Sequence, residues 1–209
     1  MRVNAHYPGS RFMSRLLALT LALPVLSLRA QDPTGYLDDF LPVENALVSD
    51  VPEAVYNADQ ADVQRGRYLV SLLGCASCHT DGALLGAPDG DRLLAGSRVG
   101  IAISDPMQER YPAVIYPPNI TPHDETGIGA WTEDELVRLL RGGMNRHGGR
   151  ALPVMPWQNY ARLHESDART IARYLQSIEP VEHEVPARVG EGTPAPAPYV
   201  HVGLYQRRD

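Results

Sequence analysis

The run Cys75-Ala76-Ser77-Cys78-His79 constrains this chain more than any other feature, because it holds both cysteines of the sequence and a histidine directly after them. Cysteines at this spacing lie about one helical turn apart, so both sulfur atoms reach the same side of a short helix. The next side chain, an imidazole, is directed to that side as well. In an exported protein, two thiols this close would otherwise risk oxidation to a local disulfide.

The motif predicts one haem c, attached covalently by thioethers at Cys75 and Cys78, with His79 as an iron ligand. A redox-active disulfide would require a thioredoxin-like strand–helix–strand setting, and no such strand pattern flanks the motif. A structural zinc site would require a second pair of ligands at regular spacing, and the sequence offers none.

The second iron ligand is expected to be Met155, which lies in a loop bracketed by Pro153 and Pro156. Proline restricts φ, so such a loop can hold a thioether towards the haem. Met144 and Met107 are the runners-up, and we interpret both as apolar filler. A bis-histidine haem stays open as an alternative. Its candidates sit in polar or Gly/Pro-rich contexts and are His123, His147, His164, His183 and His201.

The chain is expected to divide into four parts. These are a signal peptide over residues 1–30, an N-terminal extension over 31–58, one domain over 59–185 and a Pro-rich tail over 186–209. The signal peptide is indicated by arginines before an apolar run that is too short for a comfortable membrane span. We therefore predict export to the periplasm, with membrane contact only if the signal stays uncleaved.

Three helices are predicted inside the domain. Apolar spacing indicates one over residues 59–73, ended by Gly74 directly before the motif. A capping box predicts a second from Thr132, ended by Gly142 and Gly143. A third begins near residue 166 and stops before Pro180. The intervening residues 80–126 carry turn chemistry and are expected to form a long loop packed on the haem.

Charge limits the partners. The full chain has a formal net charge of −6 and no lysine, and removing the four arginines of residues 1–30, which include no acid, leaves −10. Nucleic acid is therefore excluded as a partner, and a redox protein with a basic docking surface is favoured. A local patch of Arg92, Arg98, Arg146 and Arg150 could reverse this sign near the haem.

Catalytic groups are not evident. The acids at positions 133–135 suit the first turn of a helix, where they compensate the helix dipole, so they need no catalytic role. No nucleophile elbow or phosphate-binding loop is present. The chain is thus expected to be an electron carrier or an electron-transfer subunit, not an enzyme.

Together the motif, the methionine loop and three helices in this order resemble a class I cytochrome c. The chain is similar to the haem domains in cytochrome c subunits of membrane-bound alcohol and gluconate dehydrogenases, over residues 64–181. The resemblance is carried by the runs at residues 118–122, 126–132, 153–157 and 172–175. Those subunits carry three haem motifs, whereas this sequence contains one.

The resemblance implies an all-α class I cytochrome c fold, with three or more helices and long loops around one haem. The first and last helices would cross, and Gly66 would permit close approach to the helix bearing Tyr174. Asn119 and Trp131 fall where these relatives build the haem pocket, so both are expected to contact the cofactor.

The function implied is electron transfer, with electrons accepted from a periplasmic dehydrogenase and passed to an oxidase or another cytochrome in the respiratory chain. The alternative is a haem enzyme or a small-molecule-binding haem sensor, which would need an open or displaceable distal site. Met155 between its prolines argues for a filled site.

Overall fold

The computed structural model describes residues 50–103, 111–144 and 154–202, and the signal-peptide prediction therefore lies outside the described residues. Five helices occur in this part: α1 (Ala61–Leu72), α2 (Cys75–His79), α3 (Glu133–Gly142), α4 (Trp157–Tyr160) and α5 (Glu165–Leu175). None of the described helices is long and apolar enough to cross a membrane. The predicted helices near residues 59–73, 132–142 and 166–179 are confirmed as α1, α3 and α5, with small shifts at their ends.

Local chemistry explains where α3 begins and ends. The Thr132 hydroxyl accepts a hydrogen bond from the Glu135 amide at 3.3 Å, while the Glu135 carboxylate accepts one from the Thr132 amide at 2.8 Å. This reciprocal pair satisfies two amide groups that a helix start leaves without partners. Gly143 then adopts φ +62°, a left-handed conformation that glycine reaches without strain, and ends the helix.

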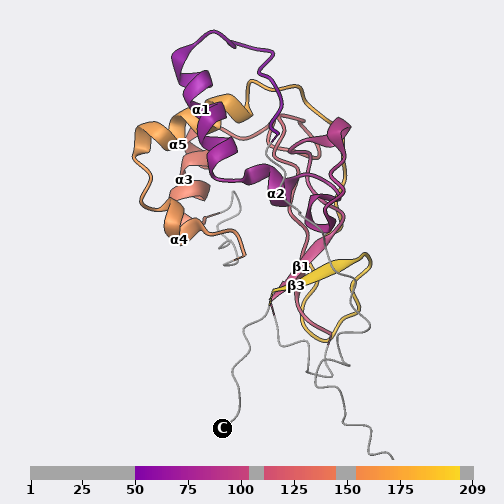
Figure 1. Ribbon diagram of the computed structural model, residues 1–209. Helices are drawn as coiled ribbons and strands as arrows, with labels where there is room; N and C mark the ends of the chain where they lie inside the picture. The colour runs from indigo at the N-terminus through magenta and orange to yellow at the C-terminus, as the bar shows by residue number, and fades with distance from the viewer. Residues whose placement is uncertain (1–49, 104–110, 145–153, 203–209) are drawn as a thin grey trace, which may run out of the picture. The chain divides into compact units, whose positions relative to one another are not determined.

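Helices α1 and α5 cross in close contact, and α3 packs against α5 (Figure 1). At the crossing, a Cβ atom on Gly66 would lie 2.0 Å from the Thr170 carbonyl oxygen and 2.7 Å from Cβ of Tyr174. Only glycine fits there, which confirms the predicted role of Gly66. The main core lies between these helices, and its fully buried side chains include Val70, Ile171 and Tyr174.

Replacing Gly66 by alanine should destabilise the protein strongly. Alanine favours a helix interior over glycine by about 1 kcal/mol. The added methyl group meets backbone on the facing helix, however, so α1 and α5 must separate. Overpacking costs typically 1–3 kcal/mol and occasionally more. We expect a net loss of roughly 2 kcal/mol or more in the free energy of unfolding by urea.

Gly90→Ala is the matched control, because nothing lies within 4 Å of a Cβ atom built there. It should change the free energy of unfolding by no more than about 0.5 kcal/mol. A Gly66→Ala protein as stable as this control would show that the two helices do not cross at Gly66.

Arginines of α5 tie the three long helices together. Arg169 Nη1 lies 2.9 Å from a Glu133 oxygen, and Arg173 Nε lies 3.0 Å from the other. Arg173 also pairs with Asp62 of α1. Hydrogen bonds from Arg169 and then Arg173 hold the pKa of Glu133 below its ordinary value of 4.5. The acids of this first turn thus act in helix packing as well as in dipole compensation.

Acid should weaken this contact. A carboxyl group with a lowered pKa in the folded state contributes stability above pH 4.5, and the contribution is lost as pH falls through the folded-state pKa. We expect Glu133→Gln to have a lower Tm than the unmodified protein at pH 7 and the two values to converge below pH 4.5. A difference in Tm that persists at pH 3, or a similar loss in Glu179→Gln, would contradict this role.

A three-stranded sheet, in the order β2-β1-β3, was not predicted. Strand β1 (Gly100–Ile103) pairs antiparallel with β2 (Val114–Ile115) and parallel with β3 (Tyr199–Val202). The all-α expectation is therefore not confirmed. The Pro-rich segment after residue 185 supplies β3, and it packs on a second small core around Ala102, Val114 and Tyr116.

Candidate functional site

The motif forms its own short helix, α2, between two fixed ends. Gly74 precedes it at φ +67°, which turns the chain sharply from α1 into α2. After it, the carbonyl of His79 accepts a hydrogen bond from the Gly96 amide at 2.8 Å. The buried Thr80 hydroxyl accepts another from the Leu94 amide at 3.1 Å. The loop after the motif, with the short 3₁₀ helices η2 (Ala83–Leu85) and η3 (Gly90–Arg92), thus holds α2 in place.

His79 is oriented by a single strong contact. Its Nδ1 atom lies 2.7 Å from the Pro118 carbonyl oxygen, which can only accept, so Nδ1 carries the proton. Nε2 therefore keeps its lone pair and can bind a metal. Burial lowers the pKa of His79, an effect partly offset by the bond to Pro118, and this favours the neutral imidazole. The ring is thus in the tautomer that an iron ligand requires.

Both cysteines are half-buried and are not joined in a disulfide. Burial, with a smaller contribution from the neighbouring Cys78, raises the pKa of Cys75 to about 12, and burial also raises the pKa of Cys78. Redox-active and zinc-bound cysteines need thiolates, which this environment disfavours. Among the described residues, no group of three or more His, Cys, Asp or Glu side chains is placed to hold a metal ion by itself. The disulfide-exchange and zinc hypotheses therefore gain no support.

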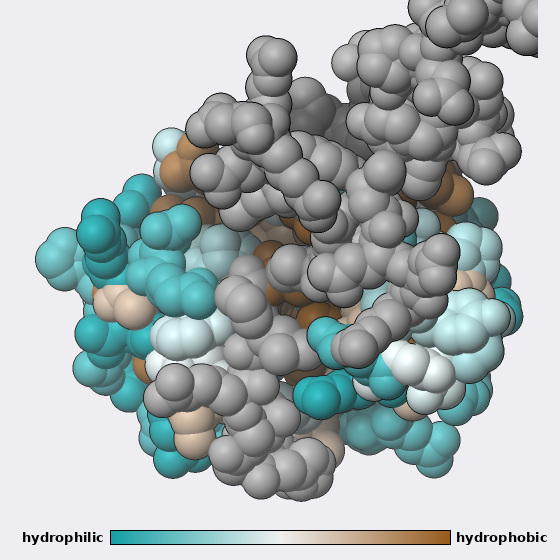
Figure 2. Space-filling view, turned by 90° about the horizontal axis from the view of Figure 1, so that it is seen from below, coloured by the Kyte–Doolittle hydropathy of each residue, from teal (hydrophilic) through white to brown (hydrophobic). Residues whose placement is uncertain are grey.

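Apolar side chains that are only partly buried surround the motif, as a haem site requires. They contact the main core and include Leu73, Ile120, Trp131, Met155, Tyr160 and Leu163. Cys75 belongs to the same set. Hydrophobic surface is visible between hydrophilic flanks on one face of the molecule (Figure 2). A neutral, oriented imidazole and two inert thiols beside unburied apolar groups fit a covalent haem.

Met155 lies two residues before α4, and its carbonyl accepts a hydrogen bond from the Trp157 amide at 2.7 Å. The Trp157 ring lies against the end of α3, since a Cβ atom on Gly143 would come within 2.6 Å of it. The end of α3 and the start of α4 are therefore clamped together beside Met155. Met144 is 40% exposed, and Met107 and His147 lie outside the described residues.

The two predicted pocket residues behave differently. Trp131 is half-buried against the main core, and its carbonyl accepts a hydrogen bond from the Gln176 side chain at 2.8 Å. Asn119 is only 2% exposed, follows Pro118 directly and bonds to protein groups with both atoms of its amide. Neither Pro118 nor Tyr160 was predicted. Tyr160 lies near the motif, because the Cys75 and Cys78 thiols help burial to raise its pKa to about 12.

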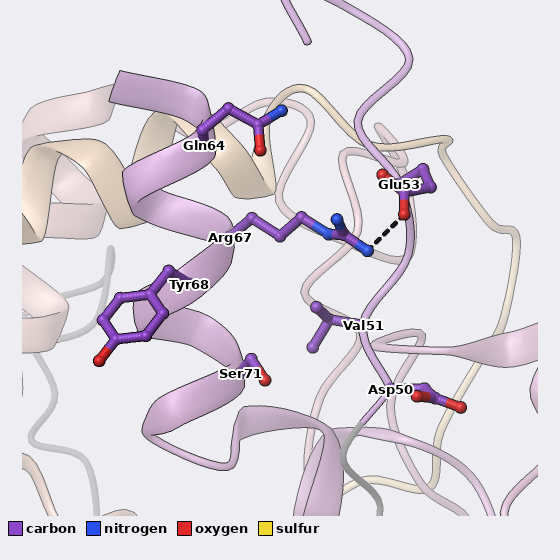
Figure 3. Close-up of a pocket in the computed structure, with 7 residues that line it drawn as sticks. All are labelled: Asp50, Val51, Glu53, Gln64, Arg67, Tyr68 and Ser71. Atoms are coloured by element: carbon purple, nitrogen blue, oxygen red, sulfur yellow. Dashed lines mark hydrogen bonds and ion pairs between the residues drawn. The ribbon is translucent and has the colours of Figure 1, made fainter. Parts of the chain in front are cut away.

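A cavity of about 500 Å³ lies along α1, where Arg67 pairs with Glu53 (Figure 3). It is lined by Asp50, Val51, Glu53, Gln64, Arg67, Tyr68 and Ser71. This lining contains neither imidazole nor sulfur, so the cavity lacks the iron ligands of a haem site. The candidate site is the motif and its apolar surroundings.

Comparison with known proteins returned dehydrogenase subunits, most of them cytochromes, although no family model matches the chain. The chain is 36% identical to the cytochrome c subunit of a quinone-dependent alcohol dehydrogenase of Gluconobacter oxydans, over 60% of this chain and 23% of that protein. It is 36% identical to the fructose dehydrogenase cytochrome subunit of Gluconobacter japonicus, over 62% of this chain and 24% of the relative. It is 31% identical to one component of the nicotinate dehydrogenase of Pseudomonas putida, over 73% and 12%. The matched region thus spans about a quarter or less of each of these relatives.

Proposed function

Because the chain is a relative of the cytochrome c subunits of alcohol, fructose and gluconate dehydrogenases, we propose that it is an exported single-haem electron carrier with His79 and Met155 as iron ligands. The observation that carries this proposal is the His79 imidazole, held by the Pro118 carbonyl at 2.7 Å with Nε2 left to bind iron. It lies in a helix with two thiols and beside apolar side chains that a haem would cover.

When bound, haem c supplies a one-electron iron couple. Cys75 and Cys78 anchor it as thioethers, so it does not dissociate. His79 donates electron density through Nε2, and the thioether of Met155 favours the reduced state. Ile120, Trp131 and Leu163 exclude water on the apolar sides. These residues position a cofactor and hold its electronic environment, and none of them is placed as a proton donor to a substrate.

The alternative function, a haem enzyme or sensor, needs an open distal position with polar groups. Met155 is half-buried against the main core, and the Trp157–Gly143 clamp lies two residues from it. A side chain held in this way is hard to displace, which favours electron transfer over ligand chemistry.

The relatives suggest a dehydrogenase as donor, and the predicted signal peptide suggests that transfer takes place in the periplasm. Electrons would pass from that dehydrogenase to an oxidase or another cytochrome. The relatives named for alcohol, fructose and nicotinate differ in substrate. We therefore leave the substrate of the donor open and propose only its class.

Reduction by the donor is expected to slow as salt increases, because the chain is acidic and favours a basic docking surface. Arg92 weakens the competing idea of a basic patch, since Asp89 at 3.5 Å and Asp81 at 3.9 Å offset its charge. Arg146 and Arg150 lie outside the described residues. Stopped-flow reduction across an ionic-strength series measures this. Rates that increase with salt would mean docking surfaces of like charge and would refute a basic partner.

The proposed function itself is tested by haem staining after denaturing electrophoresis, combined with a redox titration. One haem per chain should survive acid-acetone extraction and titrate as a one-electron couple. Complete loss of haem on extraction would rule out covalent attachment and with it the proposal.

A further inference from the structure

Asn119 uses the whole bonding capacity of its side chain inside the protein. Its Nδ2 group donates to the Val181 carbonyl at 2.8 Å and to the Thr126 hydroxyl at 3.1 Å. Its Oδ1 atom accepts from the Thr121 amide at 2.9 Å and from the Thr121 hydroxyl at 2.8 Å. The Val181 carbonyl can only accept and the Thr121 amide can only donate, so the amide orientation is fixed. No donor or acceptor of Asn119 is left for a cofactor.

These bonds fix the peptide that orients His79. Val181 follows the last helix, and its amide donates to the Thr121 hydroxyl at 3.1 Å, so the loop after Pro118 is joined to the end of α5. On the other side, a Cβ atom on Gly96 would lie 2.7 Å from the Asn119 amide nitrogen and 2.8 Å from the Pro118 carbonyl carbon. Gly96 also donates to the His79 carbonyl. The Pro118 carbonyl is thus held between the motif and α5.

We propose that Asn119 is a positioning residue, not a haem contact, and that it sets the electron donation of His79 by holding the Pro118 carbonyl on Nδ1. The inference rests on the proposed function, in which His79 binds iron. A well-aligned acceptor on Nδ1 makes the imidazole more basic and stabilises the oxidised iron. If the carbonyl loses alignment, His79 donates less electron density, and the reduction potential rises.

The test compares Asn119→Ala with the unmodified haem protein by two measurements that do not depend on a redox partner. In the reduced protein, solvent exchange of the His79 Nδ1 proton, followed by NMR, should be at least tenfold faster in the variant, because a loosened bond opens more often. The reduction potential, measured by titration, should shift upward. Ile171→Val, which removes one buried methylene from α5, is the control for general loss of stability and should change neither value.

A proton exchange rate within twofold of the unmodified protein together with an unchanged potential would overturn the inference, while a covalent haem in both proteins would leave the proposed function standing. An unmodified protein without covalent haem would instead overturn the proposed function. If Asn119→Ala does not fold, the isosteric Thr121→Val variant carries the test, since it removes one bond to Asn119. It should shift both values in the same direction by less, and no change in either would again overturn the inference.

Discussion

Replacing both Cys75 and Cys78 by alanine is expected to give a chain that carries no covalent haem after export. Each cysteine supplies one thioether, so each single variant should keep a weaker attachment and the double variant none. Without the cofactor, partly buried apolar side chains such as Ile120, Trp131 and Leu163 would stay in contact with water. The haem stain should disappear, and near-ultraviolet circular dichroism should show that tertiary packing is lost.

Ser77→Ala is the matched control, because it changes the same short helix and leaves both thioether positions intact. It should stain as strongly as the unmodified protein. A double cysteine variant that keeps its stain would mean that the haem is attached elsewhere, and a control that loses it would mean that the test reports helix geometry.

The second large effect is expected at Met155. Its replacement by alanine should abolish the weak near-infrared band that arises from sulfur bound to ferric iron. It should also lower the reduction potential, because a thioether ligand favours the ferrous state. Met144→Ala is the control, since Met144 is 40% exposed at the end of α3. If the band survives in Met155→Ala and vanishes in Met144→Ala, the distal ligand has been assigned to the wrong methionine.

Local signals made the helices predictable. The Thr132 capping box, the glycine stop at Gly143 and the apolar spacing before Gly74 each act within a few residues, and all three are found where the sequence indicates them. The role of Gly66 was also predictable, although only through resemblance, because its partners Thr170 and Tyr174 lie about a hundred residues away.

The sheet could not be predicted for the opposite reason. Its strands are two to four residues long, too short for a periodic pattern, and Gly100 pairs with Tyr199 at the far end of the sequence. The proline content of the tail also favoured an extended, unpaired conformation. Short strands with distant partners are determined by packing, here around Ala102 and Val114, which the sequence alone does not display.

At the site, residue types were predictable but their connections were not. Cys75, Cys78 and His79 follow from spacing alone. The acceptor for His79 is a backbone carbonyl, and any residue could have supplied it, so Pro118 carries no signal of its own. Asn119 carried a signal by resemblance, which suggested a haem contact, whereas its hydrogen bonds point to support of the neighbouring loop.

The central claim is that this chain carries electrons on a haem whose two axial positions are both filled by the protein. The most direct test is the visible spectrum of the reduced protein with and without carbon monoxide. Occupation by Met155 predicts that carbon monoxide leaves the spectrum unchanged, and that Met155→Ala makes the protein responsive. A rapid spectral shift in the unmodified protein would reveal an open or displaceable site and would favour the haem enzyme or sensor.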